Sequence, residues 1–363
     1  MAKRVGVDKW LFGTVLLLVL FGLVMVFSAS AVMAKETLGS PYAYVAKQAL
    51  WVALGMVALT VLMRVDYRRY NSYAVVASAV GAATLLLVGV FAMHDSHHTH
   101  RWIRFGGMLT FQPSEIAKPV LVLFLAYFLQ TRIHAMDDWR MVLKAAGPPV
   151  LFAALILKEP DLGTALVCVG VAALMLYLAG AQFKYFFMGA ALASPVLYYM
   201  LFHVAFRRAR MLAFIDPELD PKGAGFHILQ SLIAVGTGGI GGLGLMESVQ
   251  KLFYLPEPHT DFIFAVVCEE LGLIGALAVV ALFAMLGYRG LRAAVLSTDP
   301  FARFLAFGIT TAILIQAFFN MSVVLALLPT KGITLPLISS GGTSVFITLA
   351  SLGVLLNVTR EID

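Results

Sequence analysis

The chain has 363 residues, of which 61% are hydrophobic and 13% are charged. Soluble domains average about 25% charged and 45–50% apolar residues, so this composition excludes a soluble globular protein, a disordered chain and, with only 2 Cys, a disulfide scaffold. The net charge of +6 is no sign of nucleic-acid binding, because membrane proteins collect Lys and Arg in cytoplasmic loops. We therefore predict an all-α polytopic membrane protein that binds no nucleic acid.

Apolar segments near the 20 residues that cross a bilayer recur along the whole chain. The first has no charged residue and no small-residue cleavage pattern, so we expect it to remain as a span. We predict about ten transmembrane helices, with nine as the alternative because the fourth and fifth are short. They are Trp10–Ala34, Gln48–Met63, Asn71–Met93, Pro119–Gln130, Ala145–Leu157, Leu162–Gln182, Tyr185–Phe206, Phe262–Leu286, Phe304–Leu328 and Ser344–Val358.

The distribution of Lys and Arg predicts that both ends of the chain face the cytoplasm (N-in, C-in). Asp and Glu gather on the opposite, outer side, and acids have little influence on topology. They serve chemistry or cation binding there, or they form a plain solvated surface. Between spans 7 and 8, the sequence predicts a large outer loop, 207–261, within one membrane domain, 1–363. Its aromatic residues favour an ordered loop, and its apolar run Phe226–Val235 is too short to cross.

Ionisable side chains at membrane depth are the main candidates for function, since each is costly unless it is paired or hydrated. Asp261 stands directly before the eighth span, where it would serve as a general base or, alternatively, as a helix N-cap. Glu269 and Glu270 follow in the same span. Asp161 stands at the mouth of the sixth span. We expect all of these carboxylates to gather at the outer membrane boundary.

Glu115 and Lys118 stand three residues apart at the start of the fourth span, so the spacing predicts an ion pair on one helical face. This pair has either a structural or a functional role. No P-loop occurs in the chain, and no nucleotide pool exists outside a cell. Any bond formed on the outer face therefore needs a substrate that arrives already activated, such as a sugar linked to a lipid pyrophosphate.

Three further motifs carry weaker signals. Gly236–Gly241 satisfies G-x-G-x-x-G, but no strand precedes it, so we expect a hinge or a close backbone approach instead of a dinucleotide site. The histidines of 94–100 would bind metal or, more simply, lie in solvent. Ser339–Gly342 would present N–H groups to a phosphate or form a turn between helices.

Five ordered motifs between residues 101 and 344 resemble the SEDS family (shape, elongation, division and sporulation). Two short motifs favour its cell-division branch over its elongation branch, and Ser340 stands where the family usually has Tyr. The motifs are Arg101-Trp-Ile with Gln112-Pro-Ser-Glu-Ile-Ala-Lys118, Glu159-Pro-Asp-Leu-Gly163, Asp220 to Gln230, Leu255 to Ala265 with Glu269-Glu-Leu-Gly272, and Asn320 with Leu328 to Pro336.

The resemblance implies a peptidoglycan glycosyltransferase that polymerises lipid II at the outer face of the cytoplasmic (inner) membrane during cell division. It implies Asp261 as the general base of an inverting reaction. It also implies a class B penicillin-binding protein and other divisome membrane proteins as partners. The substrate-binding residues that it suggests are Glu115, Lys118, Asp161, Arg101, Arg210 and Lys331.

A divalent cation, Mg²⁺ or Mn²⁺, between a carboxylate and the pyrophosphate is chemically reasonable, although the sequence contains no closed set of metal ligands. Two other functions stay open: a lipid II flippase and the elongation-type polymerase. A flippase would need polar residues through the whole depth of the bilayer, whereas the acids here lie at the outer ends of the spans. A scaffold without catalysis would leave these carboxylates unexplained.

Overall fold

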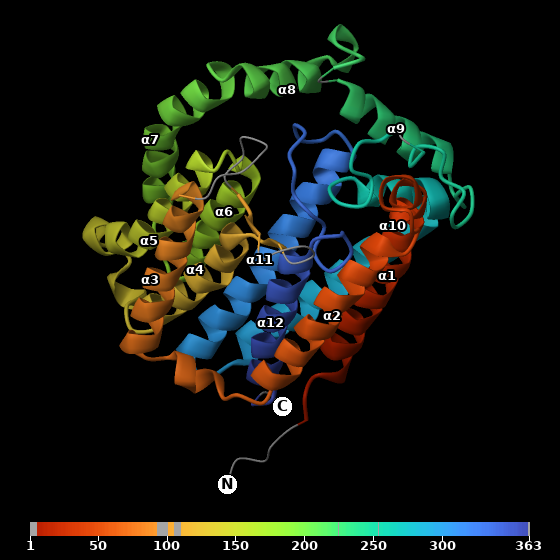
Figure 1. Cartoon of the computed structure of the whole chain (residues 1–363). Helices are drawn as coiled ribbons and strands as arrows, with labels where there is room; N and C mark the ends of the chain where they lie inside the picture. The colour runs from red at the N-terminus through yellow and green to blue at the C-terminus, as the bar shows by residue number, and fades with distance from the viewer. Residues whose placement is uncertain (1–5, 93–100, 105–109, 224, 253, 362–363) are drawn as a thin grey trace.

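The computed structural model describes residues 6–92, 101–104, 110–223, 225–252 and 254–361, and these form a helical bundle (Figure 1). The predicted site in the histidine loop 94–100 lies outside the described residues. The helices are α1 (Lys9–Leu38), α2 (Ala43–Leu62), α3 (Tyr73–Gly89), α4 (Pro113–Leu129), α5 (Trp139–Lys158), α6 (Leu162–Leu178), α7 (Phe183–Phe202), α8 (Ala205–Ile215), α9 (Phe226–Gly238), α10 (Ile263–Leu296), α11 (Pro300–Val324) and α12 (Gly342–Thr359). The shorter elements are η1 (Tyr67–Tyr70), η2 (Val90–Ala92), β1 (Ile103–Arg104), β2 (Thr110–Phe111), η3 (Ile133–Ala135) and η4 (Pro217–Leu219).

Each predicted span corresponds to one helix, which confirms the polytopic all-α fold. Among the described residues, 8 helices are long and apolar enough to cross a membrane. The other two, α4 and α6, have 17 residues each. Helix α4 begins at Pro113 instead of the predicted Pro119, because Glu115 and Lys118 pair inside the helix. Helix α10 ends at Leu296 instead of Leu286.

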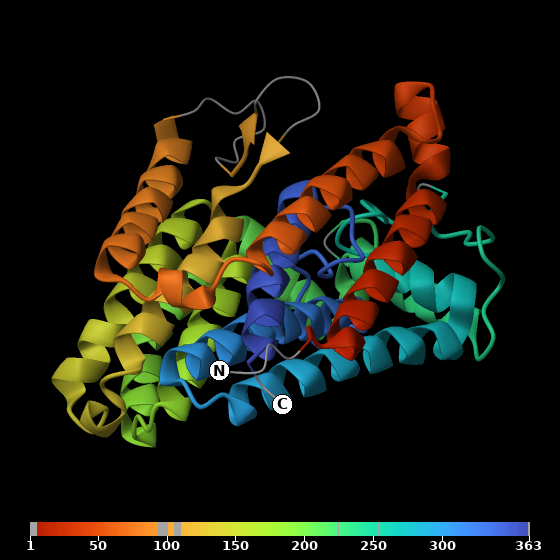
Figure 2. The same cartoon turned by 90° about the horizontal axis from the view of Figure 1, so that it is seen from below.

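The start of α1 and the end of α12 lie together at one end of the bundle (Figure 2). The backbone N–H of Asp8 donates to Thr359 Oγ1 over 3.4 Å, and Arg289 Nε donates to Asp8 Oδ2 over 2.7 Å. Helix α8 lies at the opposite end in Figure 1. Both ends of the chain therefore lie on one side of the bundle, as an even number of spans requires.

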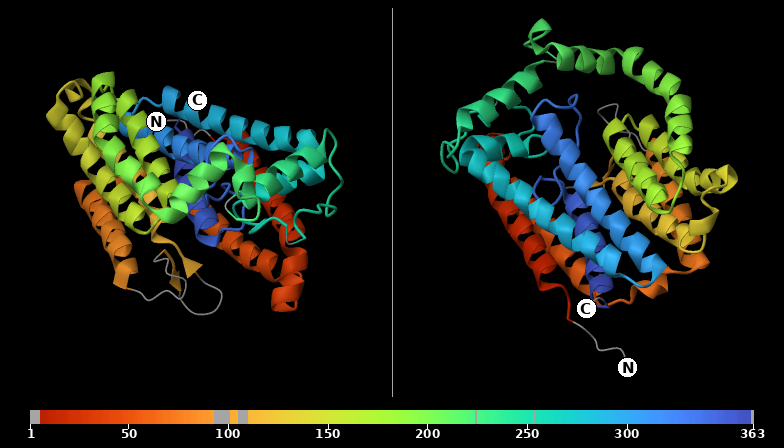
Figure 3. Two further views of the ribbon diagram at one scale, coloured as in Figure 1. Left: turned by 90° about the horizontal axis from the view of Figure 1, so that it is seen from above. Right: turned by 180° about the vertical axis from the view of Figure 1, so that it is seen from behind.

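Helices α7, α8 and α9 form an arch over the end opposite the termini (Figures 1 and 3). No described residue of α7 is buried. The seventh predicted span, Tyr185–Phe206, was too long: α7 ends at Phe202, and Ala205 already belongs to the separate helix α8. Helix α8 also carries Arg207, Arg208 and Arg210, which the sequence placed in the outer loop. The predicted short helix is α9, whose 13 residues are too few to cross a bilayer.

Helix α10 is broken at Gly272, where the backbone has φ 63° and ψ −159°. The break leaves carbonyls without partners inside the helix, and the glycine-rich segment after α9 satisfies them. The N–H groups of Leu243 and Gly244 donate to the carbonyls of Glu269 and Glu270, over 3.0 and 2.9 Å. The Gly236–Gly241 motif itself makes the expected close backbone approach to α10: the N–H of Leu273 donates to the carbonyl of Gly239 over 2.9 Å, and a Cβ on Gly238 would collide with the carbonyl of Cys268. Irregular backbone in a membrane needs such protein partners.

Candidate functional site

Two adjoining cavities lie beneath the arch. The larger has a volume of about 510 Å³ and the smaller about 330 Å³. Each is lined by segments that are far apart in the sequence. Residues that line both cavities are Arg101, Asp161, Glu257, Asp261 and Gly332. We call these five residues the shared wall, because the two cavities meet there.

Asp261 is the half-buried carboxylate of the shared wall. Burial raises its pKa to about 7, and the nearby carboxylates Glu257 and Asp161 act in the same direction, while Arg210 and Arg101 oppose them. Such a pKa suits a general base near neutral pH. The alternative N-cap role was wrong: α10 begins at Ile263, and its N-cap is Phe262 without a side-chain cap.

Four cationic side chains line the larger cavity, together with the three carboxylates of the shared wall. Arg207 and Arg210 lie three residues apart on α8, so both reach one face of the helix, and Arg101 and Lys331 contribute from other segments. Burial, followed by the charge of Arg207, lowers the pKa of Lys331 to about 8. Burial also lowers the pKa of Arg210. An anion bound here would relieve the cost of holding these cations together.

Arg101 is fixed in place by the turn between α5 and α6. Its Nε donates to the carbonyl of Glu159 over 2.8 Å, and its Nη2 donates to the carbonyl of Pro160. Asp161, one residue further, caps α6: its Oδ1 accepts from the N–H of Thr164 over 3.1 Å. The turn therefore places one cation and one carboxylate on the shared wall.

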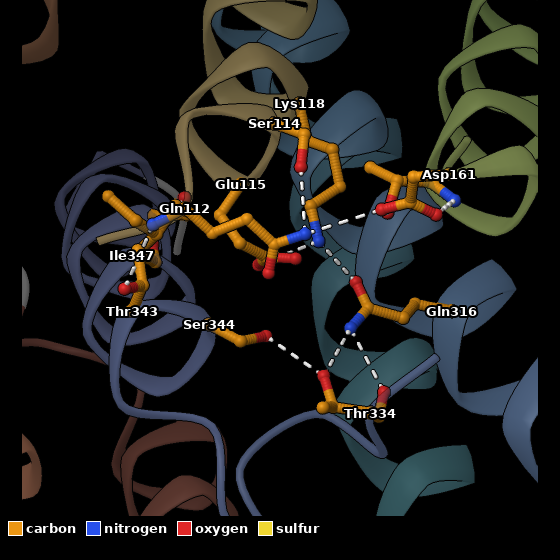
Figure 4. Close-up of polar contacts among 12 residues, drawn as sticks. Gln112, Ser114, Glu115, Lys118, Asp161, Gln316, Thr334, Thr343, Ser344 and Ile347 are labelled. Carbon is orange, nitrogen blue, oxygen red and sulfur yellow. Dashed lines mark hydrogen bonds and ion pairs between the residues drawn. The ribbon is translucent and has the colours of Figure 1, made fainter. Parts of the chain in front are cut away.

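The smaller cavity is lined by uncharged polar side chains together with Glu115 and the charged residues of the shared wall, and several of these side chains form a connected network (Figure 4). Gln316 Nε2 on α11 donates to the carbonyl of Thr334 over 3.0 Å, and the hydroxyl of Thr334 donates to Ser344 Oγ over 3.3 Å. Gln112 Nε2 donates to Asp161 Oδ2 over 3.3 Å. Such amide and hydroxyl groups suit the hydroxyls of a sugar.

Lys118 forms the predicted ion pair with Glu115, with 2.9 Å between Nζ and Oε2, and both side chains are buried. Its Nζ also donates to Gln316 Oε1. Lys118 lines neither of the two cavities, whereas Glu115 and Gln316 line the smaller one. The structure therefore places Lys118 behind the wall of the smaller cavity and away from the basic side chains of the larger one.

Glu269 and Glu270 line neither of the two cavities, and their carboxylates make contacts inside the protein instead. Glu270 pairs with Lys251 at 2.7 Å and accepts a hydrogen bond from Ser28 of α1. Glu269 accepts from the N–H of Val249 over 3.0 Å. Both carboxylates are buried and hold the loop before Asp261 against α10 and α1.

No metal site stands out among the described residues, since no three His, Cys, Asp or Glu side chains come together in them. Asp161 already accepts hydrogen bonds from Thr164 and Gln112, and Arg101 and Arg210 lie near Asp261. This donor set does not fit a resident cation. A divalent cation carried between one carboxylate and a substrate's pyrophosphate stays a prediction.

Several residues that line the cavities were not singled out from the sequence, among them Arg207, Gln316 and Thr334. Arg207 had a readable signal, since it precedes Arg210 by one helical turn on a short amphipathic helix. Gln316 and Thr334 had none, because an uncharged polar residue in or beside an apolar span gives no direction for its side chain. Their role in the cavity depends on how α11 packs against the segment that precedes α12.

The family model described as "Cell cycle protein", which covers FtsW, RodA and SpoVE, matches residues 8–363. The probable peptidoglycan glycosyltransferase FtsW of Geobacter metallireducens is 46% identical over 348 residues, which are 94% of this chain and 91% of that protein. The stage V sporulation protein E of Bacillus subtilis is 38% identical over 362 residues, covering 99% of this chain and 98% of that protein.

Two solved structures have a similar fold. One comes from a study of how a peptidoglycan synthase complex coordinates polymerization and crosslinking; it has a TM-score of 0.76 and 27% identity, with 98% of each chain covered. The other is the rod shape determining protein RodA of Thermus thermophilus, with a TM-score of 0.70, 26% identity and 98% of each chain covered.

Proposed function

The chain belongs to the FtsW/RodA/SpoVE family of cell cycle proteins, and on that premise we propose that it is a peptidoglycan glycosyltransferase that polymerises lipid II. The observation that carries the proposal is the position of Asp261, on the wall shared by a cavity with four cationic side chains and a cavity rich in amide and hydroxyl groups. A transferase for a pyrophosphate-linked sugar needs this combination. It must hold an anionic leaving group and an acceptor hydroxyl on either side of one base.

Asp261 acts as the general base in this mechanism. Its carboxylate takes the proton from the 4-hydroxyl of the acceptor GlcNAc while that oxygen attacks the anomeric carbon of the donor. The new β-1,4 bond forms as the bond to the α-linked pyrophosphate breaks, so the configuration inverts and the lipid pyrophosphate leaves with the electron pair. The raised pKa of Asp261 supports this role, because a base is most effective near the working pH.

The pyrophosphate of the donor binds in the larger cavity. Arg101, Arg207, Arg210 and Lys331 supply four cationic groups there, and guanidinium groups bind phosphate oxygens in a bidentate manner. The charge that develops on the leaving group is then stabilised by groups already fixed in place, such as Arg101 on the α5–α6 turn. The acceptor sugar binds in the smaller cavity.

The half of the bundle nearer the chain termini argues against the flippase alternative. Below the Glu115–Lys118 pair, α4 continues with Leu121, Leu125 and Leu129, which are all buried. The cavity that lies beside this pair and extends along α12 to Ser351 is small, about 30 Å³, and most of its lining residues are apolar. Moving a charged head group through such an apolar core would be costly, so polymerisation is the better interpretation.

The cellular location of the protein and its protein partners follow from the same proposal. The protein is a membrane protein, and we place it in the cytoplasmic membrane at the division septum, because FtsW relatives are similar over nearly the whole chain. Its partner is a transpeptidase of the class B penicillin-binding proteins, together with other divisome proteins. The related synthase complex that joins polymerization to crosslinking supports such a partner.

The test is polymerisation by the purified protein with lipid II, with and without a class B penicillin-binding protein. We expect glycan chains from the wild type and a loss of about 100- to 10,000-fold with Asp261→Asn, the usual contribution of a general base. Unchanged activity of this variant would remove Asp261 from the mechanism. If the wild type makes no chains with any suitable partner, a vesicle assay for lipid II flipping decides for the alternative.

A further inference from the structure

Three consecutive backbone carbonyls, those of His259, Thr260 and Asp261, accept hydrogen bonds from other parts of the chain. Ser340 N–H donates to His259 O over 2.9 Å, and Ser339 Oγ donates to Thr260 O over 2.6 Å. These residues precede α10, so helical hydrogen bonds do not fix them. The segment that carries Asp261 is held from outside.

Asn320 of α11 supplies the third hydrogen bond. Its Nδ2 donates to the carbonyl of Asp261 over 2.8 Å and to the carbonyl of Ile333 over 2.7 Å. Only 1% of Asn320 is exposed. Its amide group thus joins α11 to two other parts of the chain: residues 259–261, which we call the base segment, and the loop before α12. The loop also approaches the carboxylate itself, because a Cβ on Gly332 would lie 2.9 Å from Asp261 Oδ2.

The Ser339–Gly341 turn is itself fixed by a side chain of α2. Gln48 Nε2 donates to the carbonyl of Ser339 over 3.0 Å, and Gln48 Oε1 accepts from the N–H of Gly341 over 3.3 Å. The hydroxyl of Ser339 also accepts from the N–H of Leu335 over 2.8 Å, so both of its hydrogen-bonding functions are used. The turn is therefore a rigid platform between α2 and the base segment.

We propose that Asn320 and Ser339 are positioning residues for Asp261, which act by holding the backbone of residues 259–261 at a fixed distance from the two cavities. This inference rests on the proposed function. Neither side chain touches a substrate in this role. A base must lie within about 2.6–3.2 Å of the atom that it deprotonates, and a displacement of about 1 Å costs up to about 100-fold in rate.

The test compares kcat and KM for lipid II polymerisation in Asn320→Ala and Ser339→Ala. We expect kcat to fall by about 10- to 100-fold while KM changes by no more than about twofold, because proximity is lost and binding is kept. Ser339→Thr, which retains the hydroxyl, should restore kcat. If Asn320→Ala does not fold, Asn320→Ser tests the same point, since its short hydroxyl cannot reach both carbonyls.

Matched controls exist elsewhere in the chain. Asn357 Nδ2 donates to the carbonyl of Met63 over 2.9 Å at the opposite end of the bundle, and Ser231 Oγ donates to the carbonyl of Val324 over 2.7 Å. Asn357→Ala and Ser231→Ala remove buried hydrogen bonds of the same kind without touching residues 259–261. They should lower the unfolding temperature to a similar extent and leave kcat unchanged.

The pH dependence of kcat gives a second test, because a purely structural role of Asn320 and Ser339 would leave it unchanged. Glu257, Asp161, Arg101 and Arg210 surround the carboxylate of Asp261. A loosened segment lets water reach that carboxylate, so the acidic limb of kcat should move to lower pH in Ser339→Ala and stay in place in Ser231→Ala. Unchanged kcat in both positioning variants, or equal losses in the controls, would overturn the inference.

Failure of the proposed function has a different signature. Asp261→Asn would then retain activity, and the inference would fall with it. If Asp261→Asn is inactive while Asn320→Ala and Ser339→Ala behave as the wild type, only the positioning role is wrong.

Discussion

The carboxylate of Asp261 lies against the backbone at Gly332, where any side chain would come within 2.9 Å of its Oδ2. This close approach joins the segment before α10 to the Pro329–Gly332 loop, whose Lys331 lines the larger cavity. The proposed base, Asp261, and the proposed phosphate-binding Lys331 are thus held by neighbouring backbone segments. Replacing Gly332 would push the two apart.

The pH dependence of polymerisation should be bell-shaped. Asp261 must be deprotonated, so the rate should rise with pH up to its pKa of about 7. Lys331 must be protonated, so the rate should fall above its pKa of about 8. In Lys331→Arg the side chain stays charged at all these pH values, so the variant should lose only the alkaline limb of the profile. A profile of kcat/KM between pH 5.5 and 9.5 checks both limbs. An alkaline limb unchanged in this variant would contradict the assignment.

Arg210→Gln should raise KM for lipid II by about 10- to 100-fold, because a hydrogen bond to a charged group is worth about 1.5–3 kcal/mol. Arg208, which is exposed on the same helix and does not line the cavities, provides the matched control. Steady-state kinetics of Arg210→Gln and Arg208→Gln, measured at the same ionic strength, shows whether the effect on KM is specific to Arg210. Equal effects would mean that α8 attracts the substrate only through its overall charge.

The buried pair of Glu115 and Lys118 should show strong coupling. Lys118→Met leaves the carboxylate of Glu115 buried and unpaired, which costs about 3–5 kcal/mol, whereas the double variant with Glu115→Gln should recover most of that loss. Unfolding temperatures of the single and double variants measure this. We expect Lys118→Met to polymerise poorly, because Lys118 supports Gln316 in the wall of the smaller cavity, and to bind the proposed partner transpeptidase normally; wild-type kinetics in this variant would count against that supporting role.

Glu159→Gln should stabilise the protein at alkaline pH. Both carboxylate oxygens of Glu159 are buried without a hydrogen-bond partner among the residues that the structure describes, and burial raises the pKa of Glu159 to about 8. Between pH 4.5 and about 8 the native state holds a proton that the unfolded chain releases, so stability is lost as pH rises through that window. The unfolding temperature of the variant should exceed that of the wild type increasingly from pH 6 to 8. A gap that does not change with pH, or one shared by the exposed Glu218→Gln, would contradict this.

Part of the site could be predicted from single carboxylates that stand out in an apolar chain, namely Asp261 and Asp161. The family resemblance suggested Arg101, Arg210 and Lys331, and all five residues line the larger cavity. Lys118 stood out equally, yet its Nζ is taken by Glu115 and Gln316 behind the wall. A rare charge therefore indicates a polar interior, but its sequence position does not say which cavity it serves.

The sequence by itself determined the ten spans, because a helix is the structure that satisfies backbone hydrogen bonds in lipid and its length must match the bilayer. It also identified the unusual carboxylates. Only the tertiary structure decided that Glu269 and Glu270 hold a loop, while Asp261 faces two cavities and is held by Asn320 and Ser339. Those contacts join residues 59 and 79 positions apart. Hydropathy carries no information about such pairs, because it fixes where a helix lies in the membrane but not which neighbour its polar face meets.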